Sequence, residues 1–265
     1  MFDLEPHGPD TFVGTGPRYP WGGLYGGQIV AQALRAAAMT VDHGFVPHSM
    51  RAYFIRSGDH AEPVRYEVDR IRNGRSFVTR RVVARQAVGA ILNAECSMQR
   101  DEGSHELQTV SMPIVDGPDA TTNSSFSPHF DRRWIAEDAL AGQARDGSGR
   151  SAAWMRVRDL VDDEPILHQA WLAYISDDLP TDAVKAAYRR AFDAPAADPV
   201  GISLDHTIWF HRAMRADRWH LHDYSCHHLF GARGLAIGHV FDERGLHVAT
   251  VAQEVLLRTR PPATA

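Results

Sequence analysis

The sequence predicts an α+β fold in which one unit, a helix followed by an antiparallel sheet, occurs twice. In each half, a stretch with apolar residues at helical spacing precedes several runs of alternating polar and β-branched or aromatic residues. Two intervals also agree, because Ser49 and Gln99 are 50 positions apart and so are Ser203 and Gln253. We therefore expect two copies of one unit, with their edge strands paired into one continuous sheet.

The first copy begins with the glycine-rich segment WGGLYGGQ and a helix over 29–41. Small residues dominate this helix, so another element can pack very close to it, and Gly26-Gly27 before it is typical either of such close packing or of an anion site at the helix start. A meander of strands follows, with turns at Asn73-Gly74 and around Gly89. The strands are expected over 50–56, 64–71, 76–86 and 90–99. The hairpin is rich in arginines, including Arg80, which suit either a solvated face or contacts to phosphates.

The second copy follows a polar, turn-rich segment over 101–126, which we interpret as a linker between a domain over 1–100 and a domain over 127–265. Another stretch of low hydrophobicity, 141–151, is expected to be a mobile loop. A helix is predicted over 166–177, and the last hairpin turns at Glu243-Arg244-Gly245. The strands of this copy are expected over 203–212, 219–228, 233–242 and 246–258.

Composition removes several classes of function. The chain has 265 residues and a net charge of −5, which gives no basic surface for nucleic acid. No apolar run approaches the roughly 20 residues that span a bilayer, and the acidic N-terminus lacks a secretory core. Cys96 and Cys226 are far apart and show no metal-site spacing, so we expect reduced thiols and a cytoplasmic protein.

The second helix closes with two adjacent acids, in the stretch HQAWLAYISDD. An acid at a helix end is ordinarily solvated, and we assign that role to Asp178, whereas Asp177 is the candidate to face a cleft. Gln253 shares its strand parity with apolar residues, and a polar side chain among such neighbours needs a partner. Ser203 opens a strand, where a serine is also an ordinary cap.

Seven ordered motifs make the chain resemble the acyl-CoA thioesterase II family, the double-hotdog thioesterases, from about Tyr25 to Arg258. The resemblance implies a double hotdog, two helix-wrapped antiparallel sheets joined into one, and hydrolysis of acyl-CoA to free fatty acid and CoA. It also implies a homo-oligomer, with no cofactor or metal expected. The motifs are LYGGQIVAQAL, HSMRAYFIRSGD, RNGRSFVTRRVVA, LHQAWLAYISD, SLDHTIWFHR, RGLAIGHVFDERG and VAQE.

The same resemblance implies a catalytic set, matched here to Asp177 in YISD, Ser203 in SLDH and Gln253 in VAQE. The first half keeps Ser49 and Gln99, but Ala37 stands roughly where the acid would be. The resemblance therefore assigns the chemistry to the second half alone.

These residue types suit thioester hydrolysis. A desolvated carboxylate has a raised pKa, which makes it a better general base near neutral pH, and a hydroxyl and an amide can orient the attacking water. The residues leave open whether Asp177 acts as a base on water or as a nucleophile that forms a mixed anhydride.

Two other functions fit the sequence less well. An enoyl-CoA hydratase of the same fold would need a His and acid pair, but His168 and Asp177 lie two and a half helical turns apart. A non-catalytic acyl-CoA binding protein would have no need of a desolvated acid. Neighbouring Asp205 and His206 point to opposite faces of a strand, so we expect both to be structural, and the many histidines show no metal-site spacing.

Overall fold

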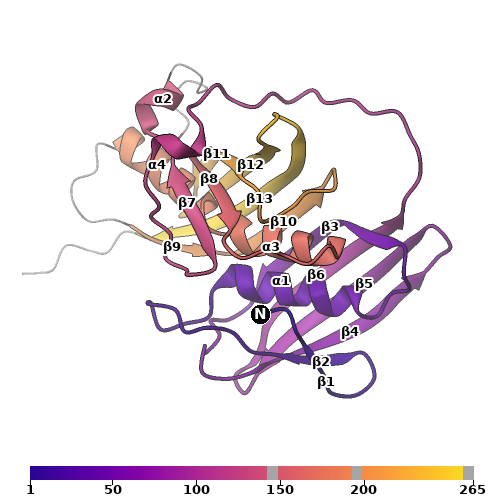
Figure 1. Ribbon diagram of the computed structural model, residues 1–265. Helices are drawn as coiled ribbons and strands as arrows, with labels where there is room; N and C mark the ends of the chain where they lie inside the picture. The colour runs from indigo at the N-terminus through magenta and orange to yellow at the C-terminus, as the bar shows by residue number, and fades with distance from the viewer. Residues whose placement is uncertain (142–148, 193–198, 259–265) are drawn as a thin grey trace, which may run out of the picture.

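The computed structural model describes residues 1–141, 149–192 and 199–258 of the chain (Figure 1). Within these residues, 13 strands form a single antiparallel sheet. The order along it is β1-β2-β4-β5-β6-β3 in the first half and β10-β13-β12-β11-β8-β7 in the second, and β9 pairs with β13 beside this path. The two halves meet where β3 pairs with β10, so the edges of the two copies close against each other.

The strands of the first half are β1 (Glu5–Pro6), β2 (Thr11–Gly14), β3 (Phe45–Phe54), β4 (Val64–Asn73), β5 (Phe77–Gln86) and β6 (Gly89–Arg100). Those of the second half are β7 (Phe130–Trp134), β8 (Arg150–Val157), β9 (Val200–Ser203), β10 (Asp205–Phe210), β11 (His220–Phe230), β12 (Arg233–Asp242) and β13 (His247–Arg258). The helices are α1 (Gly26–Ala38), α2 (Glu137–Ala141), α3 (Pro165–Ser176) and α4 (Pro180–Phe192), and η1 (Pro118–Ala120) is a single 3-10 turn.

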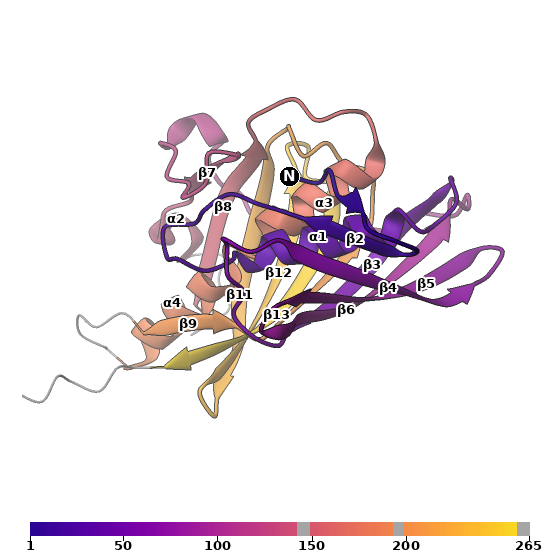
Figure 2. The ribbon, with the colours of Figure 1, turned by 90° about the horizontal axis from the view of Figure 1, so that it is seen from below.

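Helices α1 and α3 lie side by side on one face of the sheet (Figures 1 and 2). They run antiparallel, so the start of each helix lies beside the end of the other. At one end a Cβ on Gly27 would lie 2.2 Å from the Tyr174 carbonyl oxygen, which only glycine avoids. At the other end Arg35 and Glu164 form an ion pair at 2.7 Å. The alanines of α1 are almost all fully buried, as the predicted close packing requires.

Several elements of the fold were not predicted from the sequence. Each copy also has a strand before its helix, β2 or β8, and the second copy carries the additional helix α4. Part of the loop predicted over 141–151 lies outside the described residues, at 142–148, but Arg150 and Ser151 already belong to β8. Five consecutive residues of β8, from Ser151 to Met155, are buried, so the strand lacks the alternation by which strands are found.

Residues 101–117 contain no helix or strand and lead from β6 of the first half to η1 (Figure 1). They are held to the second half at several points. The Trp154 indole donates to the Asp116 carbonyl at 2.8 Å, and the Gln108 amide donates to the Gly245 carbonyl at 3.0 Å. Among the described helices, none is both long and apolar enough to cross a membrane.

The equal 50-residue intervals do not mark equivalent positions in the two copies. In the first half, one extra residue, His48, separates the pairs Pro47–Met98 and Ser49–Ser97. In the second half, one extra residue likewise separates the pairs Ser203–Val255 and Thr207–Ala252.

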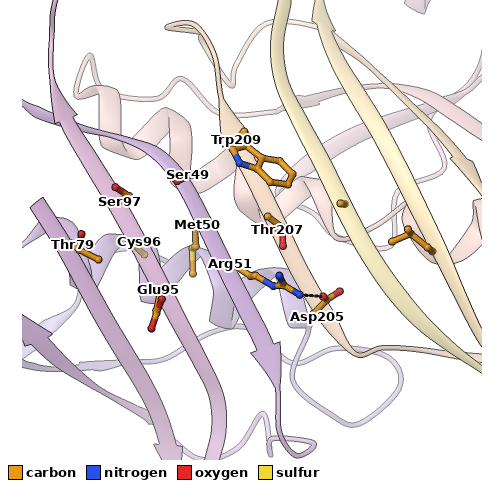
Figure 3. Close-up of a pocket in the computed structure, with 12 residues that line it drawn as sticks. Ser49, Met50, Arg51, Thr79, Glu95, Cys96, Ser97, Asp205, Thr207 and Trp209 are labelled. Atoms are coloured by element: carbon orange, nitrogen blue, oxygen red, sulfur yellow. Dashed lines mark hydrogen bonds and ion pairs between the residues drawn. The ribbon is translucent and has the colours of Figure 1, made fainter. Parts of the chain in front are cut away.

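When these irregularities are matched, Ser203 corresponds to Pro47. Counting along the last strand, Gln253 then corresponds to Cys96 rather than Gln99. Ser49 instead lies on the open face of the sheet, beside a cavity of about 380 Å³ that Arg51 and Trp209 also line (Figure 3). It is therefore not a counterpart of Ser203.

Candidate active site

The carboxylate of Asp177 lies at the junction of the two copies. Asp177 caps the C-terminus of α3, and its residue is only 7% exposed. The start of α1 meets it from the first half, where a Cβ on Gly26 would lie 2.6 Å from Asp177 Oδ2. Gly26 is thus needed for the carboxylate to fit, and the Gly27 N–H also donates to it. The prediction that Asp177 faces inward is confirmed by this geometry.

Ser203 and Gln253 join Asp177 in one chain of hydrogen bonds. The Ser203 hydroxyl, at the end of β9, donates to Asp177 Oδ1 at 3.1 Å. The Gln253 amide, on β13, donates through Nε2 to Ser203 Oγ at 2.7 Å. The three residues singled out in the sequence therefore meet in space, although 76 positions separate the first from the last.

His206 extends this chain of hydrogen bonds, although the sequence predicts only a structural role for it. It is fully buried, and its Nδ1 lies 2.6 Å from Gln253 Oε1. Its Nε2 lies 2.9 Å from the Ser176 hydroxyl, in the last turn of α3. The signal that could have found it is that His206 shares its strand parity with the apolar Ile208 and Phe210, which are buried with it on the inner face of β10.

The neighbouring Asp205 lies on the opposite face of β10, as strand alternation predicts. Its carboxylate accepts the Glu254 N–H at 2.7 Å and pairs with Arg51 at 3.3 Å across the junction of the two halves (Figure 3). Asp205 and His206 therefore do not form a dyad.

Burial raises the pKa of Asp177 to about 7, against an ordinary value of 3.8. The hydrogen bonds from Ser203, Gln253 and the Gly27 N–H act in the opposite direction and lower it. A carboxyl group with this pKa changes protonation state near neutral pH, which is what a general base requires. Burial also lowers the pKa of His206, which favours its neutral imidazole.

Asp178 is not the solvated neighbour that the sequence suggested. Its side chain is 7% exposed and forms an ion pair with Arg132 at 2.6 Å. Burial raises the pKa of Asp178 to about 6, and the Arg132 guanidinium opposes this rise. Local sequence pattern does not reveal this partner, because Arg132 lies on β7, 46 positions earlier.

Aromatic rings surround the site on the side of the helix pair. Tyr25, which precedes α1, contacts the rings of Phe126 and Tyr174 at centroid distances of 5.2 and 5.0 Å. The Tyr25 hydroxyl is buried and, among the described residues, has no hydrogen-bond partner. Burial raises the pKa of Tyr25 and the Asp177 carboxylate raises it further, so this hydroxyl lies near the acid.

The remaining candidate residues lie elsewhere. His168 is near the start of α3, where its Nδ1 accepts the Ala216 N–H at 3.2 Å, so it does not reach Asp177. The close-packing interpretation of Gly26-Gly27 is confirmed. Arg80 is neither on a solvated face nor open to a phosphate, because it is buried beneath the first-half sheet at 2% exposure. Within the described residues, no group of three or more histidine, cysteine or acidic side chains has the geometry to hold a metal ion.

Comparison with known proteins gives one consistent result. The family model described as the acyl-CoA thioesterase N-terminal domain matches residues 15–99, and that of the acyl-CoA thioesterase C-terminal domain matches residues 107–257. Human acyl-coenzyme A thioesterase 8 is 31% identical over 294 aligned positions, which cover 98% of this chain and 88% of the relative.

Solved structures give the same picture. The crystal structure of the acyl-CoA thioesterase II TesB2 from Mycobacterium marinum is 34% identical, with a TM-score of 0.85 over 100% of this chain and 98% of that chain. A protein with a hot dog fold from Alicyclobacillus acidocaldarius shares the fold alone, at 18% identity and a TM-score of 0.78 over 98% of this chain and 97% of that chain. The predicted double hotdog is confirmed by these likenesses and by the single joined sheet.

Proposed function

We propose a reaction mechanism and the residues that carry it out, starting from the finding that the chain belongs to the acyl-CoA thioesterase family. It hydrolyses acyl-CoA thioesters to a free fatty acid and CoA. The observation that carries the assignment of residues is the buried Asp177 carboxylate, held at the end of a hydrogen-bond chain from Ser203 and Gln253. Such an acid is costly to bury without a purpose, since burial disfavours its charged form.

The proposed mechanism uses Asp177 as a general base. The ionised carboxylate takes a proton from a water molecule while the water oxygen bonds to the thioester carbonyl carbon. The resulting tetrahedral oxyanion collapses, the carbon–sulfur bond breaks, and the CoA thiolate recovers the proton from Asp177. Ser203 and Gln253 keep the carboxylate in place and supply polar atoms to orient the water, each worth on the order of 3 kcal/mol in the transition state.

The aromatic surface formed by Tyr25, Phe126 and Tyr174 is the proposed contact for the acyl chain. Apolar ring faces favour an aliphatic chain through the hydrophobic effect. In the described structure the Asp177 carboxylate is buried. The acyl chain and the thioester of the substrate must therefore displace part of this aromatic surface to reach it.

Replacement of Asp177 by asparagine tests the proposal. Asp177→Asn keeps the size and one acceptor oxygen but removes the base, so kcat should fall by about two to four orders of magnitude. The measurement is CoA release, followed with a thiol reagent over acyl-CoAs of several chain lengths. Ser49→Ala on the open face is the matched control and should keep full turnover. Near-native turnover by Asp177→Asn would exclude the assignment.

Two further measurements separate the alternatives. In one turnover with H₂¹⁸O, a general base places the label in the fatty acid, whereas an anhydride intermediate attacked at its aspartyl carbonyl places it in Asp177. Crotonyl-CoA that gains water without releasing a thiol would support a hydratase, and saturable binding without turnover would support a binding protein.

The organisation of the chain is part of the same proposal. We assign an N-terminal hotdog to 1–100, a linker to 101–126 and a C-terminal hotdog with the active site to 127–265. A homo-oligomer is supported by the open face of the sheet, where Tyr53 is 46% and Trp209 40% exposed. A cytoplasmic location is supported by Cys96 and Cys226, which are both free thiols.

A further inference from the structure

We propose that His206 is a positioning residue that fixes the orientation of the Gln253 amide, and through it the hydrogen bond that reaches Asp177. This inference rests on the proposed function, because it assigns a task within the same site. His206 touches none of the reacting groups in the mechanism. It acts only through Gln253.

The orientation of the Gln253 amide decides whether it presents a hydrogen-bond donor or an acceptor to Ser203. The carbonyl oxygen of glutamine can only accept hydrogen bonds, and the NH₂ group can only donate them. Ser203 Oγ and the Asp177 carboxylate lie on one side of Gln253, and the His206 ring lies on the other. A flip of the amide would therefore present an acceptor where a donor is needed.

The ionised Asp177 carboxylate determines which group donates in each hydrogen bond of this series. Asp177 accepts only, so Ser203 must donate its single hydroxyl proton to it, and Ser203 Oγ must in turn accept from Gln253 Nε2. Gln253 Oε1 then faces His206 Nδ1 at 2.6 Å, and this contact is favourable only if Nδ1 carries the proton. His206 is consequently the Nδ1–H tautomer.

Ser176 completes the arrangement. With the proton on Nδ1, the neutral ring leaves Nε2 as an acceptor, and the Ser176 hydroxyl lies 2.9 Å from it. The hydroxyl also lies 3.2 Å from the Ala173 carbonyl, within its own helix. Ser176 must therefore give its proton to His206 rather than to Ala173.

The reverse arrangement is self-consistent only without the charge on Asp177. If His206 carried its proton on Nε2, it would donate to Ser176, which would donate to the Ala173 carbonyl, and Gln253 would turn its oxygen toward Ser203. Ser203 would then give its proton to the amide, and Asp177 would lose a donor in a buried site. In its Nδ1–H form, which the ionised Asp177 selects, His206 donates to Gln253 Oε1 and so opposes the amide orientation that disarms the carboxylate.

The tautomer of His206 is the first test, and it needs no activity. The ¹⁵N chemical shifts of the imidazole distinguish Nδ1–H from Nε2–H in wild-type protein labelled at its histidines, with the His206 signals assigned from their loss in His206→Asn. We expect the neutral Nδ1–H form at pH 8. A neutral Nε2–H form, or a protonated ring, would overturn the proposal.

A double-mutant cycle is the second test. His206→Leu should lower kcat about tenfold and leave KM within twofold, since one oriented polar group is affected. In a Gln253→Ala background the same substitution should cost nothing more, because His206 would have no amide left to orient. His206→Asn, which can still donate an N–H toward Gln253, should recover most of kcat in the wild-type background.

The outcomes are distinct. An equal loss from His206→Leu in both backgrounds would show a merely structural role and refute the proposal. If His206→Leu does not fold, His206→Asn and the tautomer decide the question. If Asp177→Asn keeps its turnover, the proposed base is wrong, but the ¹⁵N measurement still tests the amide orientation by itself.

Discussion

The two copies of the unit differ in the side chains at one equivalent place, the C-terminal end of the helix that packs on the sheet. At the end of α3 lie the Asp177 carboxylate, Ser203 and Gln253. At the end of α1, the Arg80 guanidinium occupies the corresponding space. Its Nε donates to Thr40 Oγ1 at 2.8 Å, and one terminal nitrogen donates to Asn73 Oδ1, also at 2.8 Å.

The strand registers explain this exchange. Arg80 on β5 pairs with Cys96, and Ala236 on β12 pairs with Gln253, so the arginine and the alanine are counterparts. The small Ala236 leaves room beneath the second-half sheet for the buried polar chain, whereas the long Arg80 fills that room in the first half. The same helix-and-sheet unit thus holds either a buried polar site or a filled core, according to the volume and charge of the side chain at this position.

The largest effect is expected from placing the first-half arginine in the second half. Ala236→Arg directs a guanidinium toward the end of α3, where it would pair with Asp177 and lower the pKa of that carboxyl group. We expect kcat to fall by about a thousandfold, as for loss of the base. Ala236→Met adds similar bulk without charge and is the control, read by CoA release and by thermal unfolding. Equal losses in the two variants would mean that bulk alone matters.

The pH dependence of turnover should report the titration of Asp177, the proposed base in the second half. In the proposed mechanism the ionised form of Asp177 is the active one. Because the pKa of this carboxyl group is about 7, kcat/KM should fall about tenfold per pH unit below pH 7 and level off above it. The measurement is the pH profile with a substrate whose chemistry limits the rate. A profile that is flat between pH 5 and 8 would contradict this role.

The same pKa predicts a change in stability. The folded pKa of about 7 exceeds the ordinary 3.8, so the group contributes stability below pH 3.8 that is lost as the pH rises through 7. Asp177→Asn escapes this loss and should be more stable than wild type at pH 8, by on the order of 4 kcal/mol. The difference should shrink toward pH 4 in denaturant titrations, and a constant difference would argue against a raised pKa.

The two serines at the ends of the compared intervals should behave differently. Ser203→Ala removes the donor to Asp177 and should lower kcat about a hundredfold. Ser49→Ala alters only the open face of the sheet and should change kcat by less than twofold. Equal losses of kcat would mean that Ser49 and Ser203 are equivalent, which contradicts the register of the strands.

The smallest effect on turnover is expected in the first half. Arg80→Leu leaves several buried oxygens without donors, so we expect about 3 kcal/mol lower stability with kcat changed less than threefold. Arg81→Leu is the control, because Arg81 is 47% exposed and its pair with Asp69 contributes little. A large loss of kcat in Arg80→Leu would show that the first half does more than support the site.

Local pattern was enough to predict much of this protein. Helical spacing in α1 and α3, alternation in β4 and the Asn73-Gly74 turn are properties of neighbouring residues, so the sequence revealed them. The motif YISD likewise singled out Asp177. Where burial removes the alternation, as in β8, the local pattern does not reveal the strand.

Contacts between distant residues were decided only in the folded chain. The sequence by itself determined the repeated unit, the helix that ends in an acid, and the residue types able to activate water. Only the tertiary structure decided that Asp178 pairs with Arg132, that His206 faces Gln253, and that Arg80 fills the first-half site. The physical reason is that strand register and burial depend on the pairing of segments far apart in the chain, and a single extra residue in one strand changes which side chains meet.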